Sequence, residues 1–172
     1  MNTIKMDWDS LAPVAATTTP DHGFGAGGQW PEEGEHAAFV LGLSTTELEF
    51  VQKADGQKFP ATGFRFSYQL CQDPERETPL KWDGCLMVIP NRVGDLTDEK
   101  SKRRAGISIS QLQGHLGTIL SREVGKDIKE ALDEVEEKLD GDSQIAVTLA
   151  VQVDQYQGKE YHKEFLRTLL AN

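Results

Sequence analysis

The sequence predicts one β domain in which two helices precede the last two strands. Three observations carry this prediction: alternating strand-like segments between residues 37 and 89, two helical periods between 110 and 139, and a closing β-hairpin. A chain of 172 residues can bury the core of one such domain, whereas two full domains would be crowded.

The first 30 residues are expected to form a flexible arm, because they are rich in Thr, Ala, Gly, Pro and Asp and have no periodicity. The folded domain is then expected to cover residues 31–172. Residues 37–43 are the first credible strand, which can continue with a bend as far as residue 52. The segment 54–57 has the composition of a turn.

The second strand is predicted over residues 64–71 from a clean alternation of ring and polar side chains. Phe64, Phe66 and Tyr68 share one face, and we expect these rings to fill the core. Arg65 would then lie on the opposite face, where it could meet a phosphate. The alternative is that the rings themselves form a stacking platform.

Residues 80–89 predict a third strand that stops at Pro90. Lys81 and Trp82 stand at its start. Trp82 can either stack on a nucleic-acid base or cap the core, and the pattern does not separate the two roles.

Residues 95–104 read as a polar loop that carries the cations Lys100, Lys102, Arg103 and Arg104. These could clamp phosphates from a mobile loop, or only balance nearby acids on a solvated surface. A helix is predicted from an N-cap at Ser110 to about residue 122, and a second over 127–139. The second helix is strongly acidic outside its apolar stripe and should point away from bound phosphates.

The closing hairpin alternates core residues with smaller and more polar ones from Ile145 onward. A two-residue turn at Gln157-Gly158 sets the register. It pairs Tyr156 with Lys159, Asp154 with Tyr161, Gln152 with Lys163, Ala150 with Phe165, and Thr148 with Arg167. Rings and cations therefore share the non-core face, an arrangement that suits single-stranded nucleic acid, although an ordinary solvated face would have the same pattern.

Three antiparallel strands, a helical insert and two more strands is the element order of the OB-fold, a five-stranded antiparallel Greek-key barrel that binds oligonucleotides. The chain also resembles phage-encoded single-stranded-DNA-binding proteins with this fold, over about residues 31 to 168. The likeness is carried by Pro31-Glu-Glu-Gly-Glu-His36, by Val124-Gly125 after a helix, and by Val151-Gln-Val-Asp-Gln-Tyr-Gln-Gly-Lys-Glu-Tyr161.

The resemblance implies sequence-tolerant binding of single-stranded DNA during phage replication or recombination, with no catalytic residue and no cofactor. Replication or recombination proteins are expected as further partners, and a homo-oligomer is compatible with this role. The residues expected to contact the nucleic acid are Arg65, Lys81, Trp82, Lys102, Arg103, Arg104, Tyr156, Lys159, Tyr161, Lys163, Phe165 and Arg167.

The amino-acid composition argues against some classes of function and indicates a cellular compartment. A net charge of -10 argues against a protein that coats duplex DNA by bulk electrostatics. Cys71 and Cys85 lack zinc-ligand spacing and are expected to be buried thiols in a reducing compartment. The chain shows no secretory signal and no apolar run of membrane-spanning length, so a cytoplasmic location is expected.

Catalysis has little support, because the four histidines are scattered and none has a Ser, Cys or carboxylate at a telling distance along the chain. Two other hypotheses remain beside single-strand binding. One is an OB-like protein-interaction or virion-assembly module, and the other is a metal-dependent nuclease that uses some of the many carboxylates.

Overall fold

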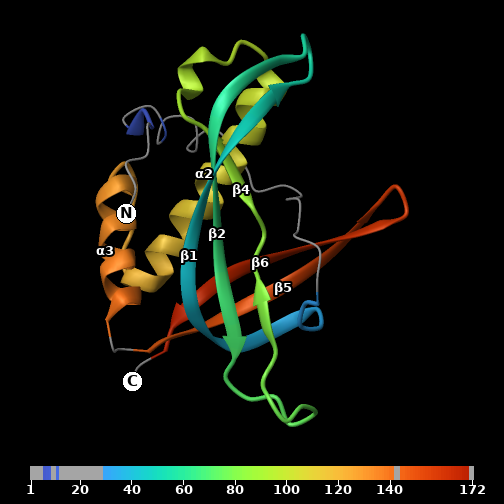
Figure 1. The fold of residues 1–172 in the computed structure, drawn as a ribbon, viewed down its shortest axis with the longest axis vertical. Helices are drawn as coiled ribbons and strands as arrows, with labels where there is room; N and C mark the ends of the chain where they lie inside the picture. Colours follow the sequence, from blue (N-terminus) through green and yellow to red (C-terminus); the bar gives the residue numbers. More distant parts are fainter. Residues whose placement is uncertain (1–5, 9–10, 12–28, 142–143, 171–172) are drawn as a thin grey trace.

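A computed structural model describes residues 6–8, 11, 29–141 and 144–170 of the chain. Its centre is an antiparallel sheet in which the strands follow the order β3-β2-β1-β5-β6, and β4 pairs with β2 as well. Helices α2 and α3 pack on one side of the long β1–β2 ribbon, and the β5–β6 hairpin extends away on the other (Figure 1). The prediction of a β-class domain with a helical insert is therefore confirmed.

The longest strands are β1 (Gly34–Gln52) and β2 (Gln57–Leu70), which pair along almost their whole length. A bulge between Val40 and Gly42 bends β1. Its first part, up to Val40, also pairs with β5. The bent first strand and the turn after it are thus as the sequence predicts, and Gly56 takes the left-handed conformation (φ 72°) that the turn requires.

The predicted third strand is divided into β3 (Lys81–Asp83) and β4 (Met87–Pro90), both paired with β2. The backbone N–H of Gly84 still donates to the carbonyl of Phe66 (2.7 Å). The next N–H, of Cys85, instead donates to the side-chain carboxylate of Glu164 from β6 (2.9 Å). A distant side chain therefore interrupts the strand, which periodicity cannot reveal.

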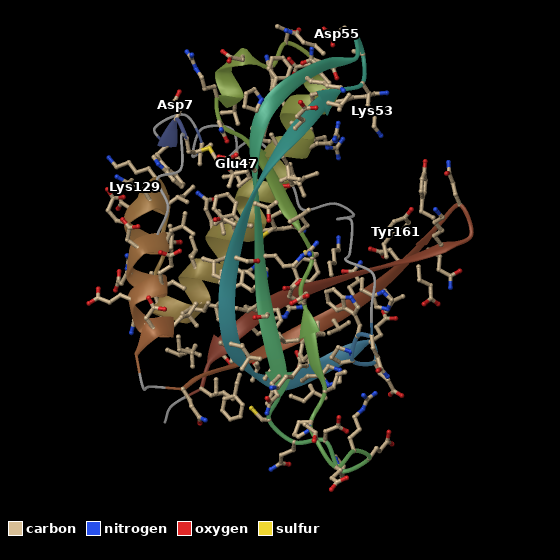
Figure 2. The ribbon with its side chains drawn as sticks, in the orientation of Figure 1. Asp7, Glu47, Lys53, Asp55, Lys129 and Tyr161 are labelled. Carbon is tan, nitrogen blue, oxygen red and sulfur yellow. The ribbon has the colours of Figure 1, made fainter. Side chains whose placement is uncertain are left out.

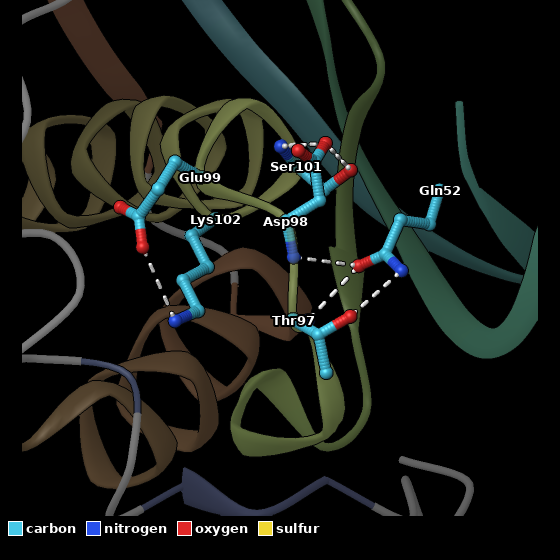
Figure 3. A network of polar contacts seen from close by, with 6 residues as sticks. All are labelled: Gln52, Thr97, Asp98, Glu99, Ser101 and Lys102. Carbon is cyan, nitrogen blue, oxygen red and sulfur yellow. Dashed lines mark hydrogen bonds and ion pairs between the residues drawn. The ribbon is translucent and has the colours of Figure 1, made fainter. Parts of the chain in front are cut away.

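Helix α2 (Glu99–Leu120) begins well before Ser110, so the predicted start of this helix is wrong. The true N-cap is Asp98, whose carboxylate accepts the N–H of Ser101 (3.2 Å). The amide oxygen of Gln52, at the end of β1, accepts the N–H groups of Thr97 (3.0 Å) and Asp98 (3.1 Å) (Figure 3). Residues 99–104 are therefore helical turns and not the mobile loop that their charge suggested.

Helix α3 (Ile128–Asp140) agrees with the prediction and ends at Gly141. Its buried face consists of Ile128, Ala131, Leu132 and Val135, and its acidic residues point outward. This face closes the far side of the core.

The closing hairpin consists of β5 (Ile145–Tyr156) and β6 (Lys159–Leu169). Gln157 (φ 52°) and Gly158 (φ 77°) form the predicted two-residue turn, both with the positive φ of a type I′ turn. The register is as predicted from Tyr156 and Lys159 down to Ala150 and Phe165. A bulge follows, so Thr148 pairs with Thr168 and not with Arg167; the two threonine hydroxyls are 2.6 Å apart.

The rings of Phe64, Phe66 and Tyr68 are fully buried, which confirms that they belong to the core. Met6 and Leu11 are buried in the same core, so the described part of the N-terminal arm packs on the domain. Cys85 is buried and Cys71 half-buried, and both are free thiols.

The sheet is open, so the closed five-stranded barrel that the element order predicts is not found. Within the described ranges, no strand pairing joins β6 to β3 or β4. Side chains occupy this gap instead. Trp30 stacks on His162 of β6 (ring centroids 5.4 Å apart) and approaches Trp82 of β3 (6.5 Å). Between β6 and β3, packing of aromatic rings therefore takes the place of strand pairing.

Candidate nucleic-acid interface

The outer face of the hairpin presents the most accessible rings of the predicted site. Tyr156 is 62% exposed, and Tyr161 is half-buried beside it on the same face. Lys159 is exposed directly opposite Tyr156. Because the hairpin extends away from the body of the protein, these groups can be approached from solvent (Figures 1 and 2).

Lys163 and Phe165 lie nearer the body of the molecule. Lys163 is only 3% exposed, its Nζ lies 3.8 Å from Oδ2 of Asp154, and its ammonium sits 5.3 Å from the centroid of the Phe165 ring. The Lys163 charge therefore neutralises a neighbouring acid and supports a ring. Arg167, which the bulge moves out of the predicted register, is exposed.

Arg65 and Lys81 continue the same face of the sheet across β2 and β3. Lys81 pairs with Gln69, which pairs with Phe39 of β1, which in turn pairs with Ala146 of β5. Lys81 is exposed, and Arg65 is half-buried. One continuous face, which we call the outer sheet face, thus carries Arg65, Lys81 and the hairpin rings and cations.

Trp82 lies on the opposite, core-facing side. It is 6% exposed, and its ring stacks on Tyr68 with centroids 5.1 Å apart. Of the two roles open to it, the structure places this indole where it caps the core.

The basic residues of α2 lie beside the far end of the β1–β2 ribbon, away from the hairpin (Figure 1). Lys102 is 3.5 Å from the carboxylate of Glu99. Arg104 donates to the carbonyl of Val51 (3.1 Å), and its guanidinium sits 4.5 Å from the centroid of Phe50. Arg103 is exposed. The structure therefore does not bring this cluster together with the hairpin, and Arg104 serves packing within the fold.

A buried polar cluster that sequence reasoning missed centres on Glu164, which has no exposed surface. Its carboxylate accepts the N–H of Cys85 (2.9 Å) and lies 3.4 Å from Nε2 of His115. The other ring nitrogen of His115, Nδ1, is 2.8 Å from the carbonyl of Gln111. Because a carbonyl only accepts, Nδ1 is the ring nitrogen that carries a proton toward Gln111.

The cluster holds Glu164 in its charged form. Burial acts to raise the pKa of Glu164, but the neighbouring His115 side chain, with the N–H of Cys85, keeps that pKa below its ordinary value. Burial, followed by the nearby Glu164 charge, raises the pKa of both Tyr68 and Cys85, which therefore remain neutral. A side chain at Gly84 would collide with Glu164 and Tyr68, so the site requires glycine there.

This cluster is closed to solvent, with Cys85 1% and His115 2% exposed, and it joins β6, α2 and the break between β3 and β4. Because a substrate cannot reach it, we interpret the cluster as a structural link between these elements and not as a catalytic site. One signal in the sequence could have found it. In the predicted register Glu164 stands opposite Val151, which is a core position where an acid is out of place.

Comparisons of the chain with protein-family models, curated proteins and solved structures found no match. Within the part of the chain that the structure describes, no group of three or more His, Cys, Asp or Glu side chains is placed to hold a metal ion. No described helix combines the length and apolar character needed to cross a membrane.

Proposed function

We propose that the protein is a sequence-tolerant single-stranded-DNA-binding protein with an OB-like fold, and that the outer sheet face is its binding surface. The observation that carries the proposal is the extended β5–β6 hairpin, which presents Tyr156, Tyr161 and Lys159 together on that face. Support also comes from the strand order, because β1 lies between β2 and β5 and the helices connect β4 to β5.

The chemistry of the face suits an unpaired strand. Bases stack on tyrosine rings with about 1–3 kcal/mol per base, and any base offers a flat face, so the binding tolerates sequence. Lys159, Lys81 and Arg65 would meet phosphates along the face. The acidic helix α3 lies on the other side of the molecule, where its carboxylates do not repel the strand (Figure 1).

The resemblance to phage single-stranded-DNA-binding proteins suggests the biological process in which this activity is used. Binding of exposed strands would protect them during replication or recombination of a phage genome in the host cytoplasm. The protein then acts without a cofactor and without catalysis of its own, and its further partners are replication or recombination proteins.

Titration of fluorescein-labelled oligo(dT) by fluorescence anisotropy, at several salt concentrations, tests the proposal. We expect Tyr156→Ala to weaken binding about fivefold or more through lost stacking. We expect Lys159→Ala to lower the slope of log affinity against log salt by about 0.7, which is one phosphate contact on a single strand.

Two control variants match these changes. Gln155→Ala alters the neighbouring exposed position on the opposite face of the hairpin. Lys129→Ala removes one positive charge from α3, far from the hairpin (Figure 2). Both should bind oligo(dT) like the unchanged protein. An absence of binding at low salt, or equal losses in the controls and the hairpin variants, would contradict the proposal.

A further inference from the structure

A pocket of about 210 Å³ lies between α2 and β6. The residues around it come from one stretch of the helix and two adjacent positions of the strand: Ser110, Gln111, Gly114, His115, Phe165 and Leu166. Phe165 also belongs to the outer sheet face, so the pocket adjoins the proposed DNA-binding surface.

Gly114 forms part of the pocket wall and is exposed in the middle of α2, where glycine is less favourable than alanine. No described residue forces position 114 to lack a side chain, because a Cβ placed there would have no atom within 4 Å. Gly117 offers a contrast in the same helix, since a Cβ there would lie 2.8 Å from the carbonyl of Arg122. The glycine at 114 thus keeps open a space that the protein itself does not fill.

The walls of this space point to the class of ligand. Gln111 is 93% buried, and its Nε2 finds no hydrogen-bond partner within the described part of the chain. The ring of Phe165 and the side chain of Leu166 supply apolar walls. A mostly apolar pocket with one aromatic wall suits a flat ring that stacks on Phe165. The volume is below that of a typical drug-sized site, about 300–1,000 Å³, so one heterocycle fits better than a longer segment.

We propose that this pocket receives a single nucleobase, stacked against Phe165, from the strand on the outer sheet face. The inference rests on the proposed function for the source of the base. The pocket itself can also be tested with free nucleosides, independently of strand binding.

The test compares the unchanged protein with Gly114→Leu, which adds an apolar side chain at the pocket wall, where a Cβ has no atom within 4 Å. Gly94→Leu is the control, because a Cβ at Gly94 also enters open space, away from the pocket. We expect Gly114→Leu to weaken oligo(dT) binding about fivefold or more, the loss of one stacked base, with an unchanged salt slope. Gly94→Leu should bind normally. Urea denaturation should show that both variants fold.

Ligand-observed NMR with free thymidine and deoxyadenosine separates the pocket from the strand-binding face. Nucleoside binding that is lost in Gly114→Leu supports the pocket, even if oligo(dT) does not bind and the proposed function fails. Oligo(dT) binding that is unchanged in Gly114→Leu would overturn the proposal. Nucleoside binding that is absent from the unchanged protein, or equal in both, would overturn it as well.

Discussion

The buried carboxylate of Glu164 contacts His115 of α2 and the N–H of Cys85 in the break between β3 and β4. A single side chain thereby ties the edge strand β6, and the proposed DNA-binding hairpin with it, to two other parts of the fold. A buried charge is stabilising only with a partner and hydrogen bonds, and here both are supplied by residues distant in sequence.

Glu164→Gln should destabilise the protein by about 1.5–3 kcal/mol at neutral pH, because an uncharged amide replaces the buried charged acceptor of the Cys85 N–H. Urea denaturation followed by Trp fluorescence measures the free energy of unfolding. Glu134→Gln is the control: Glu134 pairs with Arg122 at 2.9 Å on the surface, and its loss should cost less than about 1 kcal/mol. Equal effects in the two variants would contradict a special role for Glu164.

The same pair predicts how stability depends on pH. The pKa of Glu164 is lower in the folded chain than its ordinary value of 4.5, so its contribution is present above pH 4.5 and is lost as the pH falls through the folded value. The difference in unfolding free energy between the unchanged protein and Glu164→Gln should therefore shrink below pH 4.5. A difference that stays constant in acid would show that this ionisation does not stabilise the fold.

At the scale of elements, the start of α2 places cations where the helix dipole disfavours them. Two features offset this cost. Asp98 caps the helix beside Glu99, and Gln52 from β1 binds the backbone just before it (Figure 3). In addition, the guanidinium of Arg104 packs on the ring of Phe50 in the β1–β2 ribbon. Contacts from outside the helix therefore define its first turns.

Asp98→Ala should lower the free energy of unfolding by about 0.5–2 kcal/mol, because the N–H of Ser101 loses its acceptor. Asp127→Ala is a matched control at the N-cap position of α3, where the aspartate side chain makes no capping hydrogen bond. Urea denaturation should show a clearly smaller change for Asp127→Ala. If the two substitutions cost the same, the Asp98 cap does not stabilise α2.

At the scale of the whole molecule, the core is completed by segments that are far apart in the chain. Leu11 has no exposed surface and packs in the same core as the sheet and helices. On the open side of the sheet, Trp30, Trp82 and His162 pack together. Leu11 and Trp30 therefore contribute to the stability of the domain.

Leu11→Ala should destabilise the protein by about 2–5 kcal/mol, the usual cost of emptying a buried leucine site. Leu41→Ala is the control, because Leu41 is 44% exposed and its loss should stay within about 0.5 kcal/mol. Thermal and urea unfolding of the two variants measure the difference. A Leu11→Ala protein as stable as the control would show that this segment is not held in the core in solution.

The features that local periodicity encodes could be predicted from the sequence. These are the ring-filled face of β2, the apolar stripe of α3, and the turn and most of the register of the closing hairpin. The first two depend on neighbours two to four positions away, which alternation or helical spacing reveals, and the hairpin register follows from its two-residue turn. Most of the candidate face on the hairpin follows from the same register.

The remaining features depended on residues that meet only in the folded protein. Gln52 binds the backbone just before α2 from the end of β1, Glu164 divided the third strand, and Asp154 neutralised the buried Lys163. By itself, the sequence determined the order of the strands and helices of a β-class domain and the turn of its closing hairpin. Tertiary structure alone decided which charges are buried and that the sheet stays open, because the energy of a charge or a sheet edge depends on the partner that covers it.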